Sequence, residues 1–175
     1  MLTLASGIQY FDLHFLGVPR VIATAMFQGP GGVALVDPGP GSCLASLEAA
    51  LAEAGHGLDD VTAILLTHIH LDHAGVTGTL VRRNPGIAVY VHEFGALHMV
   101  DPAKLIDSAT RLYGDQMERL WGEFLAVPAA NVRPLAGGER IEAAGRALDV
   151  AYTPGHASHH VSYFDASSGI AFVGD

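Results

Sequence analysis

The chain has 175 residues, of which 50% are hydrophobic and 15% are charged, so it can form a sizeable core as a single domain. A net charge of −9 argues against a general nucleic-acid or anionic-membrane binder. The single cysteine, Cys43, excludes an internal disulfide framework and a cysteine-rich metal site. No basic region precedes an apolar core at the start, and no apolar run reaches the ~20 residues that span a bilayer, so we expect a soluble, cytoplasmic protein.

The first half of the chain alternates short apolar strands with helices. A helix is expected from Ser42 to about Ala54, because its leucines recur at helical spacing. Two glycine-rich stretches lack the Gly-Lys-Ser/Thr of a phosphate-binding loop and the spacing of a dinucleotide fingerprint, so they are interpreted as turns. Strands are expected at 8–15, 21–27, 32–38, 61–68 and 87–92, and a short helix at 74–83.

Residues 93–127 have a different pattern, with two amphipathic helical segments that break at Gly114. Their apolar stripe has three interpretations, which are packed core, a homodimer contact, or a lid over an active site. After this segment the pattern returns to strands, expected at 146–153, 160–164 and 170–175. Alternating strands and helices followed by hairpins predict an α/β fold in which helices cover the sheets.

The stretch ILLTHIHLDHAGVTG, residues 64–78, ends a buried strand in four side chains that can bind metals. Residues two apart in an extended segment point the same way, so His68 and His70 can reach one ion. Asp72 and His73 follow the bend and can face a second position beside it. Imidazole suits zinc or iron, and a mixed imidazole and carboxylate set also accepts manganese. A histidine-rich surface loop without any ligand role is the alternative.

Two later segments present similar residues where an apolar strand ends. TPGHASHH, residues 153–160, turns sharply before His156, and FVGD, residues 172–175, ends in Asp175. Taken singly, His156 is a loop histidine and Asp175 a terminal charge. Asp37, before a Pro-Gly pair, is either a turn-former or an acceptor that steadies a ligand loop.

Taken in order, these segments resemble the metallo-β-lactamase superfamily, and most closely its glyoxalase II-like and lactonase-like hydrolases. The resemblance covers nearly the whole chain except residues 93–127. It implies one α/β domain over residues 1–175, an αββα sandwich with 93–127 as a helical insertion. The family pattern has a further histidine ligand well beyond the Gly-Asp strand. We therefore expect a C-terminally truncated chain with an incomplete second metal site.

The resemblance also implies a dinuclear centre of two divalent metal ions. Zinc is the preferred metal, and iron and manganese are alternatives. The first ion would be bound by His68, His70 and His156, and the second by Asp72 and His73, with Asp175 as the bridge. Asp72 is the expected catalytic residue, because it would orient a metal-bound hydroxide and take up its proton. His160 matches a second histidine of the family segment. We expect it to lie behind the metal ligands and to support them, and not to bind the metal itself.

The function that follows is hydrolysis of an ester, thioester or lactone bond in a small-molecule substrate by a metal-bound hydroxide. The sequence contains no Gly-x-Ser-x-Gly elbow that would offer a rival nucleophile. One alternative is a metal-binding scaffold without hydrolase activity. Another is a nuclease of the same superfamily. The excess of acidic over basic residues disfavours it, as does the lack of a basic patch that is interleaved with aromatic residues. A di-iron domain that reduces oxygen or nitric oxide is disfavoured because His70 stands where a carboxylate is expected.

Overall fold

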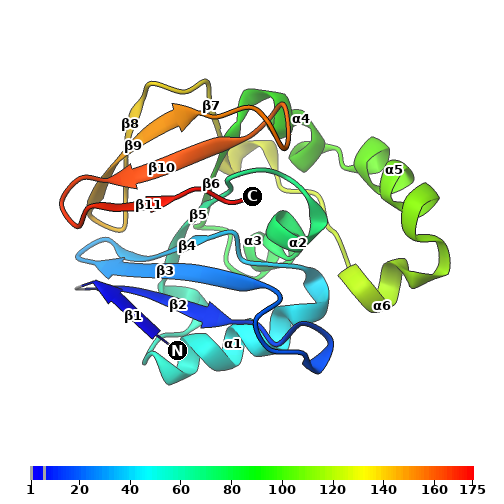
Figure 1. Cartoon of the computed structure of the whole chain (residues 1–175), viewed down its shortest axis with the longest axis horizontal. Coiled ribbons are helices and arrows are strands. Elements are labelled where there is room, and N and C mark those ends of the chain that lie inside the picture. The colour runs from blue at the N-terminus through cyan, green and yellow to red at the C-terminus, as the bar shows by residue number, and fades with distance from the viewer. Residues whose placement is uncertain (1, 6) are drawn as a thin grey trace.

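The computed structural model describes residues 2–5 and 7–175. Two β-sheets lie face to face, and helices cover the outer face of the larger sheet (Figure 1). The seven-stranded sheet contains, in spatial order, β1 (Leu2–Ala5), β2 (Ile8–Asp12), β3 (Ala23–Gly29), β4 (Gly32–Val36), β5 (Val61–Leu65), β6 (Ala88–His92) and β7 (Val132–Leu135). The four-stranded sheet has the order β11 (Ile170–Phe172), β10 (Val161–Asp165), β9 (Arg146–Tyr152) and β8 (Arg140–Ala143).

The larger sheet changes from antiparallel to parallel at β4. Strands β1 to β4 pair antiparallel, whereas β4 to β7 are joined by segments that contain helices and pair parallel. The connecting helices are α1 (Leu44–Glu53), α2 (Leu71–Ala74), α3 (Thr77–Arg83), α4 (Glu93–Val100), α5 (Ala103–Tyr113) and α6 (Met117–Trp121). Because parallel strands end at the same edge, the segments that follow β4 and β5 emerge side by side.

The alternating side chains of the central strands fill two cores. On β4, Leu35 faces the helices and packs with Leu47 of α1 and Leu80 of α3. The next residue, Val36, faces the second sheet and packs in the core that contains Tyr163 of β10. Both faces of β4 are therefore buried, which explains its continuous apolar sequence.

The structure confirms the expected α/β sandwich, and the described residues form three of its four layers. Helices cover the outer face of the seven-stranded sheet. No helix of the described chain covers the outer face of the four-stranded sheet, where Phe164 is 43% exposed. No helix among the described residues is long and apolar enough to cross a membrane.

The segment 93–127 contains three helices rather than the two that the sequence predicts. The residues between α4 and α5 are Asp101 and Pro102, and Pro102 limits helical continuation at that point. The expected break at Gly114 is confirmed and ends α5. Helix α4 buries Ala96 and Met99 in the core, whereas α5 has no buried residue and projects from the sandwich (Figure 1).

Candidate metal centre

The loop after β5 carries most of the candidate ligands. The strand ends at Leu65, three residues before His68, and not at residue 68 as the apolar run predicts. Residues 66–70 continue to the start of α2 at Leu71, and His70 itself has an extended backbone. His68 is completely buried, and α2 presents Asp72 and His73 one turn further along.

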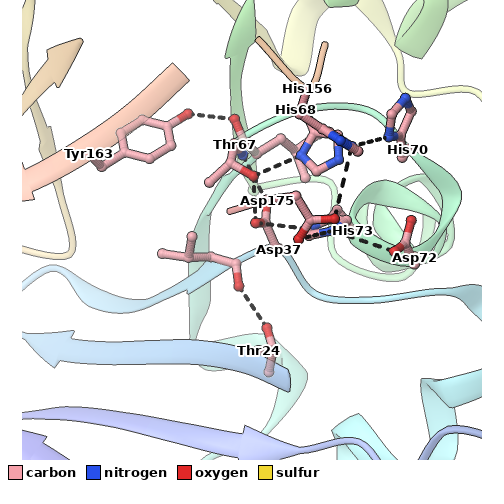
Figure 2. Close-up of polar contacts among 12 residues, drawn as sticks. Thr24, Asp37, Thr67, His68, His70, Asp72, His73, His156, Tyr163 and Asp175 are labelled. Carbon is pink, nitrogen blue, oxygen red and sulfur yellow. Dashed lines mark hydrogen bonds and ion pairs between the residues drawn. The ribbon is translucent and has the colours of Figure 1, made fainter. Parts of the chain in front are cut away.

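The second sheet brings the segment 153–160 to this loop. The segment joins β9 to β10, and its ends are closed by a hydrogen bond from the Thr153 amide to the His160 carbonyl, at 3.1 Å. The Val161 amide donates to the Thr67 carbonyl at 2.8 Å, and the buried Tyr163 hydroxyl donates to the Leu66 carbonyl at 2.8 Å. These bonds join the two sheets at the strand ends, where the metal-capable residues meet (Figure 2).

The three histidines predicted for the first metal ion come together. His68, His70 and His156 each offer a nitrogen, and these atoms lie within 4.8 Å of one another. Nε2 of His156 is 2.8 Å from Nδ1 of His70. The ring of His68 meets both others edge to face, with centroids 4.6 and 4.9 Å away.

A second group lies beside the first and shares His68 with it. His68, His73 and Asp175 offer atoms that also lie within 4.8 Å of one another. Nε2 of His73 is 3.5 Å from a carboxylate oxygen of Asp72 and 3.5 Å from one of Asp175. The other oxygen of Asp175 is 3.9 Å from Nε2 of His156. Asp175 thus lies between the two groups, although the strand before it ends at Phe172 rather than at residue 175.

Asp37 organises this centre from behind. Its carboxylate accepts hydrogen bonds from the Thr67 amide at 2.8 Å, from the Thr67 hydroxyl at 2.6 Å, and from Nδ1 of His73 at 3.0 Å. Asp37 adopts a φ of 49°, in the left-handed region, which lets the chain turn while its side chain points at the loop after β5. Of the two interpretations of Asp37, the structure supports the acceptor.

These contacts fix the tautomers of two imidazoles. A carboxylate only accepts, so the Thr67 hydroxyl and Nδ1 of His73 must both donate to Asp37. The oxygen of Thr67 lies 3.1 Å from Nδ1 of His68 and, with its own hydrogen committed, accepts from that nitrogen. Each ring therefore carries a proton on Nδ1. The neutral ring of His68 keeps its Nε2 lone pair for a ligand, whereas Nε2 of His73 can bind a metal ion once that ion displaces its proton. Sequence analysis missed Thr67, whose only signal is its position immediately before His68.

The electrostatics of His68 suit a metal ligand. Burial, followed by the neighbouring His73, His70 and His156, lowers the pKa of His68 to about 2, so this imidazole is neutral. Its Nε2 atom is buried and has no hydrogen-bond partner among the described residues. A buried lone pair without a partner is costly unless something binds it, and a metal ion would satisfy it.

The carboxylates of the second group favour positive charge on His73. Burial lowers the pKa of His73, but the hydrogen bond to Asp37 and the carboxylates of Asp72 and Asp175 outweigh it and raise the pKa to about 9. Three carboxylates thus converge on this imidazole. Combined with the neutral imidazoles beside it, the donor set fits divalent metals such as zinc, iron or manganese.

The remaining histidines lie outside both groups. His160 is buried, with its Nδ1 2.8 Å from the Thr153 hydroxyl and its ring centroid 5.4 Å from that of His68. His159 lies 5.7 Å from the ring of His70, and burial is the main reason that its pKa falls to about 4. His92 caps α4, because its Nδ1 accepts from the Phe94 amide at 3.2 Å.

The chain is an α/β sandwich whose two sheets bring together, at their strand ends, imidazoles and carboxylates that could hold a metal ion. The family model of the metallo-beta-lactamase superfamily matches residues 17–175. The chain therefore belongs to the metallo-beta-lactamase superfamily.

Similar proteins support this membership. A hydroxyacylglutathione hydrolase of Synechococcus sp. (strain JA-2-3B'a(2-13)) is 33% identical over 125 residues, which are 71% of this chain and 37% of that protein. A metallo-beta-lactamase fold-containing protein of Sulfurisphaera tokodaii is 30% identical over 60% of this chain and 41% of that protein. The crystal structure of a metallo-beta-lactamase family protein from Thermus thermophilus has a TM-score of 0.76 and 33% identity, and the match covers 99% of this chain and 60% of that one. The matches thus cover 37%, 41% and 60% of the length of these relatives, in each case less than two thirds.

Proposed function

We propose that the chain is the metal-binding part of a hydrolase that cleaves an ester, thioester or lactone bond in a small molecule. The observation that carries the proposal is the pair of ligand groups that share His68 and have Asp175 between them. Paired metal sites of this kind suit hydrolytic chemistry. Similarity to proteins named hydroxyacylglutathione hydrolase supports cleavage of an acyl bond.

We assign two divalent metal ions to the centre, with zinc preferred. The first would be held by His68, His70 and His156, and the second by Asp72 and His73, with Asp175 as the bridge. When bound, such ions supply Lewis acidity, which makes water nucleophilic near neutral pH and polarises a carbonyl group. Asp37 and Thr67 would keep the rings of His68 and His73 in the tautomer that binds.

Asp72 is the residue that we assign to orient the attacking water and hold its proton. It lies on the first turn of α2, and its side chain is 35% exposed. It lines both clefts that open at the metal centre, one toward Ala25 and Phe172 and the other toward α5. A carboxylate at this junction can accept a proton from water on either side.

The nuclease alternative has less support. None of the residues that line the two clefts at the metal centre is a lysine or an arginine. Binding of a polynucleotide depends on such cations, because each phosphate carries a negative charge. A metal-binding scaffold without activity keeps the same geometry and is distinguished by experiment.

The test combines elemental analysis with turnover of a panel of thioesters and lactones on the same purified sample. We expect bound zinc and hydrolysis that is lost on chelation and restored by added zinc. His156→Ala should lower both zinc content and rate, whereas His98→Ala, outside both ligand groups, should change neither. Stoichiometric zinc without turnover of any substrate would support the scaffold instead.

A further inference from the structure

A cleft of about 470 Å³ extends from the metal centre to helix α5, and this volume is within the range of small-molecule sites. At one end it is lined by His70, Asp72, His156 and Asp175. Its opposite wall comes from α5, which projects beside the centre (Figure 1). The cleft is therefore continuous with the residues that we assign to metal binding.

The wall that α5 contributes is apolar, and of its three wall residues Leu105 packs against the hydrophobic core. Leu105, Ala109 and Leu112 recur at helical spacing and share one face of the helix, and all three line the cleft. None of the residues of α5 is buried, and Leu112 is 75% exposed. An apolar helix face left open to water is stabilised when an apolar group covers it.

Aromatic rings form a supported surface next to this wall. Tyr113 and Trp121 both line the cleft, and their rings meet edge to face with centroids 5.1 Å apart. Trp121 is also stacked on Phe15, with centroids 5.6 Å apart, so the base of the helical arm is held against the sandwich. The apolar surface is thus already in place beside the centre.

Charge in the cleft is confined to its metal end. Beyond the four metal-capable residues the lining consists of uncharged side chains, and its polar groups are the hydroxyls of Ser108 and Tyr113 and the indole N–H of Trp121. It contains no lysine or arginine, so a carboxylate or phosphate at the α5 end would have no counter-ion in the lining. The group that fits there is uncharged and apolar.

From this arrangement we propose that α5 binds an apolar acyl chain, attached to the carbonyl group that the metal centre cleaves. This inference rests on the proposed function and specifies its substrate class as esters, thioesters or lactones of medium-chain aliphatic acids. Of the three interpretations of the helical stripe, it favours the lid over an active site and makes that lid one wall of the substrate site. The continuity of the apolar face with the ligand residues favours this occupant over a second copy of the chain.

The test measures binding of unreactive straight-chain carboxylates, which are the acid products of such substrates. Butanoate, hexanoate and octanoate are titrated into the zinc-loaded chain by calorimetry, and 1-octanol serves as a probe that needs no metal. We expect the affinity of the carboxylates to rise roughly threefold per added methylene, as apolar burial predicts. An affinity independent of chain length would overturn the proposal.

Two variants and a matched control locate the binding. Leu112→Ser should lower the affinity for octanoate and 1-octanol by roughly three- to tenfold and leave butanoate unchanged. Ala109→Trp, which fills the cleft, should abolish the chain-length dependence. Leu97→Ser removes a leucine of α4 that is 76% exposed and lies outside the cleft, and it should have no effect. Equal losses in Leu97→Ser and Leu112→Ser would overturn the proposal.

The outcome is separable from that of the proposed function. If the chain hydrolyses a substrate but its affinity for the carboxylates does not depend on chain length, the proposed hydrolase function is supported and the assignment of α5 as the acyl-chain site is refuted. If the affinity depends on chain length but no substrate is hydrolysed, the assignment of the cleft as an acyl-chain site is supported and the proposed hydrolase function is refuted. A dimer in sedimentation that Leu112→Ser dissociates would show that a second copy covers α5, and would also overturn the proposal.

Discussion

Asp37 accepts a hydrogen bond from Nδ1 of His73 at 3.0 Å, although 36 residues separate the two in sequence. The contact joins the end of β4 to the first turn of α2 and holds the imidazole with Nε2 toward the candidate centre. Asp37 lies behind the candidate ligands, and the orientation of His73 in the second group depends on it.

Asp37→Asn tests this dependence. The amide cannot accept from all three donors that the carboxylate satisfies, so His73 loses its fixed tautomer. We expect zinc affinity to fall roughly 10- to 100-fold, as for other residues behind metal ligands. Competition with a fluorescent chelator measures this affinity. The control is Asp59→Asn, an exposed residue just before β5, at the end of that strand opposite the centre. If both variants bind zinc like the unmodified chain, the role of Asp37 is refuted.

Thr67→Val tests the hydroxyl that links Asp37 to His68. The substitution keeps the shape but leaves Nδ1 of His68 without its acceptor in a buried position. The free energy of unfolding should fall by about 1–3 kcal/mol, and zinc affinity should fall with it. Denaturant titration measures the first quantity and chelator competition the second. Thr67→Ser retains the hydroxyl and should restore the zinc affinity, which a purely structural role would not require.

Titration of the metal-free chain with zinc should show two phases. The first group has three imidazoles within 4.8 Å, whereas the second depends on one imidazole of its own and on the carboxylates of Asp72 and Asp175, whose side chains are 35% and 49% exposed. The more open group should bind its ion more weakly. Calorimetry with a matched His156→Ala variant assigns the phases, because the tight phase should disappear in that variant. Two equal phases would show that the groups are equivalent.

Asp72→Asn tests Asp72 as proton acceptor and as ligand of the second ion, and it leaves the three ligands of the first ion in place. If Asp72 orients water and holds a proton, turnover should fall by roughly 10²- to 10⁴-fold, the range for loss of a general base. The zinc ion of the first group should remain, because Asp72 is not one of its ligands. Rate and zinc content are measured on the same sample, with Asp101→Asn on the α4–α5 connection as the control. Full activity in Asp72→Asn would exclude the role.

Asp165 offers a stability prediction at the opposite end of β10. Burial raises the pKa of Asp165, but hydrogen bonds from Ser167, Ser168 and Arg146 outweigh it and hold the pKa at about 2, below the ordinary value of 3.8. The ionised carboxylate therefore stabilises the fold above about pH 4, and this contribution is lost as the pH falls from about 4 through 2.

Asp165→Asn should lower the free energy of unfolding at pH 7 by about 1.5–3 kcal/mol, the range for hydrogen bonds to a charged group. The difference from the unmodified chain should shrink as the pH falls below about 4, because Asp165 then becomes protonated in both states of that chain. Denaturant unfolding at several pH values gives the comparison. Asp149→Asn breaks an exposed pair with Arg140 at 3.6 Å and should cost less than about 1 kcal/mol. A difference that persists unchanged at pH 2 would contradict the assignment.

The sequence by itself determined most of the strands, most of the helices and the candidate ligands, whereas β1 and β8 lie outside the expected strands. Apolar runs bounded by glycine and proline predict strands because burial and turn chemistry are local properties. His68, His70, Asp72 and His73 were identifiable because they stand within six residues at a strand end. The extent of that strand was not identifiable: the apolar run continues past Leu65, where pairing with the neighbouring strands stops.

Only the tertiary structure decided how these residues act together. The hydrogen bonds that Thr67 donates to Asp37 depend on the parallel pairing of Val36 with Leu65, which sets two strand ends side by side. The apolar stripe of α5 has the same pattern whether it forms core, a dimer contact or a lid, and only the tertiary structure places it beside His70 and His156. Hydrophobic periodicity records which face of an element avoids water, but not what covers that face, because the covering group comes from a distant part of the chain or from another molecule.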